Sequence, residues 1–130
     1  MRLLLTASRK LKPEHYELLA ETLRTCYPNA TELWHGGAEG GDQLGKRYCQ
    51  ENGLKEVEVR PDYTTTGMKP APLKRNDLLV ENTDATLACY LGTLEGGTAY
   101  TAKASLKAGH ETTELDCWTG LNWTHAKRTP

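Results

Sequence analysis

The segment from His35 to Asp42 constrains this chain more than any other, and it reads HGGAEGGD. It follows an extended apolar run, Ala30 to Trp34, and it precedes a run typical of a helix, Gln43 to Asn52. A strand that breaks into glycines and restarts as a helix leaves backbone N–H groups unpaired at the helix N-terminus, where the helix dipole also favours anions. The segment therefore predicts an anion-binding junction.

A second strand–glycine–helix junction runs from Tyr90 to Thr98 and reads YLGTLEGGT. Two such junctions in a chain of 130 residues predict a ligand that carries phosphate, a nucleotide or a derivative of one. The familiar phosphate fingerprints are missing from the sequence. There is no GxxxxGK[ST], which disfavours a P-loop NTPase, and the first strand is not followed by GxGxxG, which disfavours an ordinary NAD(P) dehydrogenase.

Hydrophobic periodicity predicts an α/β fold in which strands and helices alternate. We expect a Rossmann-like, mostly parallel sheet of about five strands with helices on both faces. The expected strands are 2–6, 31–35, 55–60, 85–91 and 112–118, and the expected helices are 13–26, 42–52, 73–82 and 98–108. Residues 1–118 would form one domain, and 119–130 a C-terminal tail without a clear element. Residues 61–72 would form a loop that covers a ligand or an interface.

Composition narrows the choice of partners. The formal net charge is -1 and 25% of residues are charged, so the chain shows no electrostatic footprint for nucleic acid or acidic lipid. The four cysteines form no CxxC pair, which predicts buried or half-buried free thiols and no metal site. No stretch approaches a membrane-spanning length. We therefore expect a cytoplasmic protein, of a cell or of something that infects one, and neither a nucleic-acid nor a membrane partner.

Ligands of doubly wound sheets bind beyond the carboxyl ends of the strands. Three segments bring glycines or polar side chains to that edge, and the helix that begins near Leu73 adds two more residues from the side. The candidate ligand-binding residues are Thr6, Ser8, Arg9, His35, Gly36, Gly37, Gly40, Asp42, Arg75, Asn76, Gly92, Gly96, Gly97 and Thr98.

Each candidate has an expected role. Backbone N–H groups of Gly36, Gly37, Gly96 and Gly97, together with Thr98, would bind phosphate. Arg75 would pair with phosphate through two hydrogen bonds, and Asn76 would bind a base or ribose edge. Asp42 would cap a helix or accept ribose hydroxyls. His35 would fix the glycine loop by hydrogen bonds rather than act as an acid or base.

Four short motifs resemble the SLOG superfamily in their order and spacing, and most of all its small YspA/YpsA-like branch. They are TASR at 6–9, HGGAEGGD at 35–42, RN at 75–76 and GGT at 96–98, and the resemblance covers residues 2–116. It implies a Rossmann-like fold that binds nucleotides or molecules derived from them. Relatives include the lonely-guy phosphoribohydrolases and sensor domains for cyclic ADP-ribose-type signals in bacterial anti-phage systems.

Two positions depart from the family pattern. Ala7 replaces the usual glycine of the first turn, which would hold a ligand further from the backbone. Thr101 stands where the phosphoribohydrolases carry a Glu that supports cleavage of the glycosidic bond, and a threonine hydroxyl cannot replace a carboxylate in that role.

The Thr101 substitution favours binding over hydrolysis, and we expect no cofactor. We expect a homo-oligomeric sensor or sequestering protein for an ADP-ribose-type or cyclic nucleotide signal, which would suit a phage protein that blunts immune signalling. The alternative is a nucleotide N-glycoside hydrolase that uses Asp42 and Arg75. A role on DNA, as in some SLOG relatives, is disfavoured by the near-neutral charge.

Overall fold

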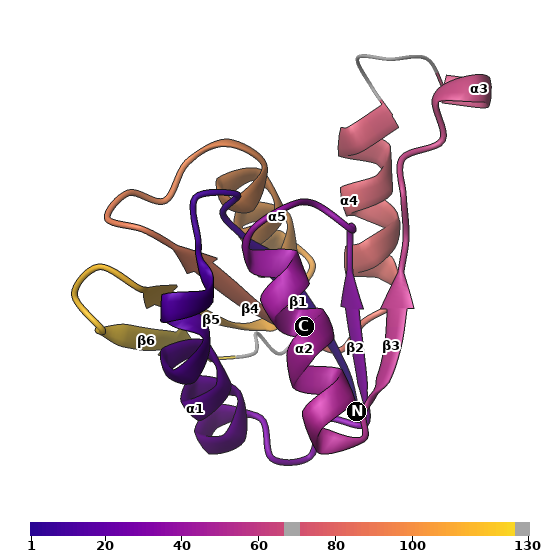
Figure 1. Ribbon diagram of the computed structural model, residues 1–130. Helices are drawn as coiled ribbons and strands as arrows, with labels where there is room; N and C mark the ends of the chain where they lie inside the picture. The colour runs from indigo at the N-terminus through magenta and orange to yellow at the C-terminus, as the bar shows by residue number, and fades with distance from the viewer. Residues whose placement is uncertain (67–70, 127–130) are drawn as a thin grey trace.

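The computed structural model describes residues 1–66 and 71–126. Its centre is a six-stranded sheet in the order β3-β2-β1-β4-β5-β6 (Figure 1). The strands are β1 (Arg2–Ala7), β2 (Glu32–His35), β3 (Lys55–Glu58), β4 (Ala85–Tyr90), β5 (Glu111–Asp116) and β6 (Asn122–His125). All neighbouring strands from β3 to β5 pair in parallel, and only β6 is antiparallel to its neighbour. The prediction of a mostly parallel sheet is confirmed.

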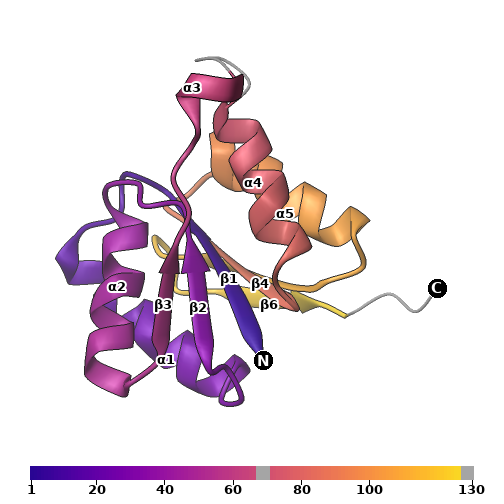
Figure 2. The ribbon, with the colours of Figure 1, turned by 90° about the vertical axis from the view of Figure 1, so that its right-hand side faces the viewer.

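Helices cover both faces of this sheet, as expected. A short 3-10 turn, η1 (Pro13–His15), leads into α1 (Tyr16–Cys26), and the further helices are α2 (Gly41–Asn52), α3 (Tyr63–Thr66), α4 (Ala71–Glu81) and α5 (Gly96–Lys107). Figure 2 shows α1 and α2 on one face, with α4 and α5 on the other. No helix within 1–66 and 71–126 is long and apolar enough to cross a membrane.

The central strands are buried on both faces because helices pack against each of them. Along β1, Leu3 and Leu5 join the core formed with α1 and α2, whereas Leu4 packs with Leu79 and Val80 of α4 on the opposite face. Every residue of β4 is buried. The cysteines are free thiols, and all but the half-buried Cys26 are buried.

Glycines let α2 approach the sheet closely. A Cβ on Gly41 would lie 2.1 Å from the Cβ of Ala7, and one on Gly45 would lie 2.4 Å from Leu5 Cδ2. Since Ala7 faces α2, its methyl group fills the space that Gly41 leaves. The start of α2 is thereby seated directly over the carboxyl end of β1.

The structure differs from the expected elements in two places. A sixth strand, β6, forms within the segment expected to be a tail, and residues 127–130 lie outside the described part of the chain. The expected loop 61–72 contains α3 and the first residues of α4, while 67–70 are not described. The strand β6 and the helix α3 each have only four residues, and hydrophobic periodicity cannot be recognised over so short a segment.

Candidate functional site

A cavity of about 580 Å³ lies where the carboxyl ends of β1 and β4 meet, the point at which the strand order reverses. Ligands of doubly wound sheets bind at such a point. The end of β1, the first glycine loop, α4 and the start of α5 all contribute to its walls. Of the candidates from the sequence, it brings together Thr6, Ser8, Arg9, Gly36, Asp42, Arg75, Asn76, Gly96, Gly97 and Thr98.

Four candidates do not line this cavity: His35, Gly37, Gly40 and Gly92. His35 is fully buried behind the first glycine loop. Its Nδ1 accepts the N–H of Gly37 at 2.9 Å, and its Nε2 lies 2.6 Å from a carboxylate oxygen of Glu56. These two partners assign the ring proton to Nε2. His35 therefore fixes the loop.

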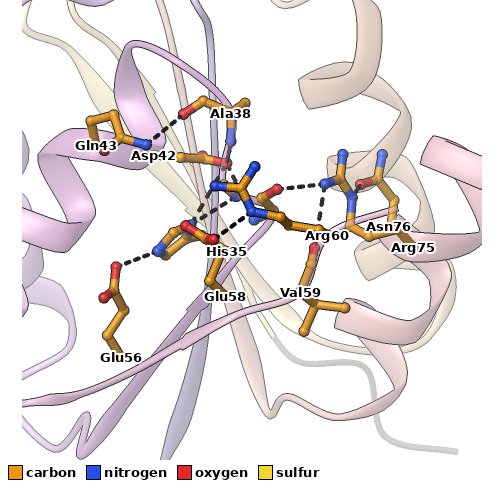
Figure 3. Close-up of polar contacts among 12 residues, drawn as sticks. His35, Ala38, Asp42, Gln43, Glu56, Glu58, Val59, Arg60, Arg75 and Asn76 are labelled. Atoms are coloured by element: carbon orange, nitrogen blue, oxygen red, sulfur yellow. Dashed lines mark hydrogen bonds and ion pairs between the residues drawn. The ribbon is translucent and has the colours of Figure 1, made fainter. Parts of the chain in front are cut away.

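Asp42, next to His35, also holds this loop (Figure 3). Its Oδ2 accepts the N–H groups of Gly36 at 3.2 Å and of Ala38 at 3.1 Å. Burial raises the pKa of the Asp42 carboxyl, although the nearby His35, the Ala38 amide and Arg75 act in the opposite direction. The amides of Gly36 and Gly37 thus already have acceptors in the protein, contrary to the role in phosphate binding expected for them.

The second junction has the open amides. The N–H groups of Gly96, Gly97 and Thr98 meet no acceptor within the described residues, and that of Ala99 is the first to bond back, to Glu95 O. Glu95 is the N-cap of α5, yet its side chain makes no capping bond and instead pairs with Lys10 Nζ at 3.0 Å. Of the two junctions, the start of α5 is therefore the one whose backbone amides are open in the way that anion-binding helix N-termini require.

Gly92 has a structural role near this junction. Its N–H donates to Asp116 Oδ1 at 2.9 Å, and its φ of 82° lies in the left-handed region that favours glycine. Gly40, with φ of 74°, is also constrained, because a Cβ there would lie 2.4 Å from Arg9 O.

Two guanidinium groups flank the open amides. Arg75 is half-buried and donates from Nη1 to Gly36 O and from Nε to Asn76 Oδ1, both at 2.7 Å. Burial lowers its pKa, Asp42 raises it and Arg9 lowers it further. The Arg9 side chain is exposed and makes no hydrogen bond or ion pair with any residue that the structure describes. The cavity therefore contains the unpaired guanidinium of Arg9 beside the hydrogen-bonded guanidinium of Arg75.

Gly97 keeps the cavity open in front of these groups. A Cβ at this position would meet nothing nearer than Asn76 Nδ2 at 3.9 Å, whereas a Cβ on Gly36 would lie 2.3 Å from Arg75 Nη1. A side chain at 36 would therefore displace the Arg75 guanidinium from its hydrogen bond to Gly36 O, whereas no contact of the described protein requires glycine at 97.

His35, Glu56 and Glu58 are the one group in the described ranges whose ligand atoms lie close enough for a metal ion, within 4.8 Å of one another. The hydrogen bond from Gly37 makes this group unsuitable. A metal-bound histidine normally donates from its other ring nitrogen, but Nδ1 of His35 accepts. Metal at Nε2 would require a fully deprotonated ring.

Thr101 is buried and its hydroxyl has no partner among the described atoms. It does not line the cavity. The side chain at this position therefore does not contact a ligand bound there.

The list of candidates omits eight residues of the cavity wall: Leu5, Ala7, Lys10, Ala38, Pro72, Leu73, Leu79 and Glu95. Of these, Ala7 was expected near the ligand only as a departure from the family motif. Lys10 and Glu95 stand next to recognised motifs, which is the one signal that could have included them. Their ion pair joins residues 85 positions apart, and no local pattern reports it.

Three solved structures share this fold. DNA processing protein A from Helicobacter pylori, studied for its single-stranded DNA binding mode, gives a TM-score of 0.68 at 17% identity, over 88% of this chain and 65% of that one. DNA processing protein A from Streptococcus pneumoniae gives 0.71 at 12% identity, over 88% and 50%. The protein TM1055 gives 0.63 at 21% identity, over 85% and 71%. No protein-family model and no curated protein sequence matches this chain.

The fold of this chain is therefore Rossmann-like, as in these three structures. This chain spans about two thirds of one DNA processing protein and half of the other. The likeness corrects one expectation, the exclusion of a nucleic-acid partner: a protein of this fold is described with a single-stranded DNA binding mode. Net charge averages over the chain and hides local clusters such as Arg9, Lys10 and Arg75 in one cavity.

Proposed function

We propose that the protein binds a nucleotide-derived small molecule through its phosphate and leaves it chemically unchanged. One observation carries the proposal: the uncapped start of α5 presents open amides to a cavity that also holds Arg9 and Arg75. Amides at a helix N-terminus and guanidinium groups are the two protein groups best suited to phosphate oxygens.

The cavity volume fits this class of ligand. Pockets for small molecules typically occupy about 300–1,000 Å³, and about 580 Å³ is available here. The resemblance to the YspA/YpsA-like branch narrows the proposal to an ADP-ribose-type molecule or a cyclic nucleotide. Such a protein would act as a sensor or would sequester the ligand, as a phage counter-defence protein does.

Two features support binding without cleavage. Thr101 replaces the supporting Glu of the phosphoribohydrolases and is buried away from the cavity. Asp42, the remaining carboxylate at the base of the first loop, is already engaged by two backbone amides through one oxygen.

Calorimetric titration with AMP, ADP-ribose and cyclic AMP tests the proposal. We expect at least one to bind and Arg9→Gln to weaken its binding about tenfold, since a charge-assisted bond contributes about 1.5–3 kcal/mol. Arg24→Gln, which removes an exposed charge from α1 outside the cavity, should bind as the wild type does. Absence of heat with every nucleotide would exclude the proposed function.

Two other outcomes would support a different function. Chromatography of the recovered ligand should show it intact, and release of free base would instead support an N-glycoside hydrolase. The likeness to DNA processing protein A makes single-stranded DNA a second candidate. Fluorescence anisotropy with labelled oligo(dT) separates the candidates, because tight binding of the oligonucleotide that AMP does not displace would favour DNA.

A further inference from the structure

We propose that Asp42 makes the cavity selective for a ligand with a free ribose hydroxyl and selects against sugars whose 2′ and 3′ hydroxyls are removed or esterified. This inference rests on the proposed function and specifies the chemical class of its ligand. It starts from the second oxygen of the Asp42 carboxylate, which the fold leaves without a partner.

The Asp42 side chain is only 7% exposed, and its position is fixed. Oδ2 accepts two backbone N–H groups, from Gly36 and Ala38, and so cannot rotate away without leaving both unpaired. Oδ1 is buried and accepts no hydrogen bond from the described residues, although Asp42 lines the cavity. A buried carboxylate oxygen without a hydrogen-bond donor costs free energy, and a donor from a ligand would remove that cost.

Neighbouring side chains cannot supply this donor as they stand. His35 Nδ1 lies 4.0 Å from Oδ2 but accepts the Gly37 N–H, so it carries no proton to give. Arg75 acts on Asp42 only through its charge, and its recorded hydrogen bonds go to other acceptors.

The negative charge on Oδ1 determines which group of a ligand can bind there. A phosphate oxygen would be repelled by Oδ1, whereas a hydroxyl group can donate to it. In a nucleotide bound by phosphate at the start of α5, the sugar is the part joined directly to the phosphate. A deoxyribose inside a DNA strand has no hydroxyl at all, because its 3′ and 5′ oxygens are esterified. Because Oδ1 is buried, its contact with a ligand hydroxyl requires a small shift of the cavity wall.

The wild-type protein provides the first test. Affinities are compared by calorimetry for AMP, GMP, CMP and UMP against their 2′-deoxy and 2′,3′-dideoxy counterparts. We expect each ribonucleotide that binds to bind at least about tenfold more tightly than its dideoxy form, the effect of one charge-assisted hydrogen bond. Equal affinity of the two forms overturns the selectivity and leaves the proposed function intact. Absence of binding by every nucleotide overturns both.

Asp42→Asn provides the second test, with inorganic phosphate as an added probe. Its amide oxygen can still hold Gly36 and Ala38, while the amide NH₂ takes the place of the free acceptor. We expect the preference for ribose to fall at least fivefold and phosphate to bind more tightly, because a negative charge leaves the cavity. Glu39→Gln, an exposed change in the same loop outside the cavity wall, should leave both unchanged. Retention of the full ribose preference by Asp42→Asn contradicts the inference.

Discussion

Gly97 is a position where the fold does not require glycine but a bound ligand would. Its Cβ would point into open cavity, and glycine within a helix costs about 1 kcal/mol relative to alanine. We therefore expect Gly97→Ala to leave the melting temperature unchanged or raise it, while it weakens nucleotide binding because the added methyl group occupies ligand space. Thermal unfolding and calorimetry on the same preparation measure both effects.

Gly41→Ala is the contrasting control for this prediction. Its Cβ would lie 2.1 Å from that of Ala7, so it should destabilise the fold by about 1–3 kcal/mol. Full nucleotide affinity in a stable Gly97→Ala protein would show that the start of α5 does not contact the ligand closely.

The buried Asp42 carboxyl should make the free energy of unfolding depend on pH. Burial raises its pKa above the ordinary value of 3.8, so the carboxyl binds a proton more readily in the folded than in the unfolded state. The resulting stabilisation is complete below the unfolded-state pKa and is lost as pH rises through the folded-state pKa. We expect Asp42→Asn, which resembles the neutral form, to be more stable than the wild type at pH 7 and to lose that advantage near pH 4. Urea unfolding across this range measures it, and a difference that does not vary with pH would show that Asp42 does not titrate.

At the scale of elements, the two glycine junctions illustrate how far sequence reasoning reaches. Both were predicted as strand–glycine–helix turns at one edge of the sheet, and the structure places both there. The pattern could not tell which junction keeps its amides open. That depends on side chains: Asp42 and His35 turn inward onto the first loop, whereas Glu95 turns away from α5 toward Lys10.

We predict that the Lys10–Glu95 ion pair keeps the Glu95 carboxylate away from the open amides at the start of α5. Both side chains are more than half exposed, so the pair contributes little to stability. We expect Lys10→Met to release Glu95, whose carboxylate then caps the open amides and competes with phosphate. Nucleotide affinity should fall several-fold with an unchanged melting temperature, as calorimetry and thermal unfolding would show.

The double variant Lys10→Met/Glu95→Gln separates this mechanism from a direct contact between Lys10 and the ligand. A neutral amide caps less effectively against the helix dipole. Affinity should therefore recover in the double variant if Glu95 is the competitor, and it should stay low if Lys10 itself binds the ligand.

At the scale of the whole molecule, the alternation of strands and helices was sufficient to predict the sheet, since a parallel sheet requires crossover helices. Periodicity could not predict β6, because this four-residue strand is mostly exposed and shows no apolar alternation. It pairs with the preceding strand β5 through a backbone ladder, and its side chains also make contacts with the rest of the molecule. Thr124 Oγ1 lies 2.9 Å from Thr113 Oγ1, which is also 2.7 Å from the hydroxyl of Tyr27 in the core. The ring of Trp123 meets that of Tyr90 edge-on, with centroids 6.4 Å apart.

These contacts predict that β6 stabilises the sheet. Deletion of residues 122–130 would expose the edge of β5 and leave the Thr113 hydroxyl with one partner fewer, so we expect the melting temperature to fall by more than about 5 °C. Deletion of 127–130 alone is the control for the loss of chain length and should change it little. No residue of β6 lines the cavity, so the shortened protein should still bind nucleotide well below its lowered melting temperature. An unchanged melting temperature after the longer deletion would mean that β5 is a stable edge by itself and that β6 only rests against it.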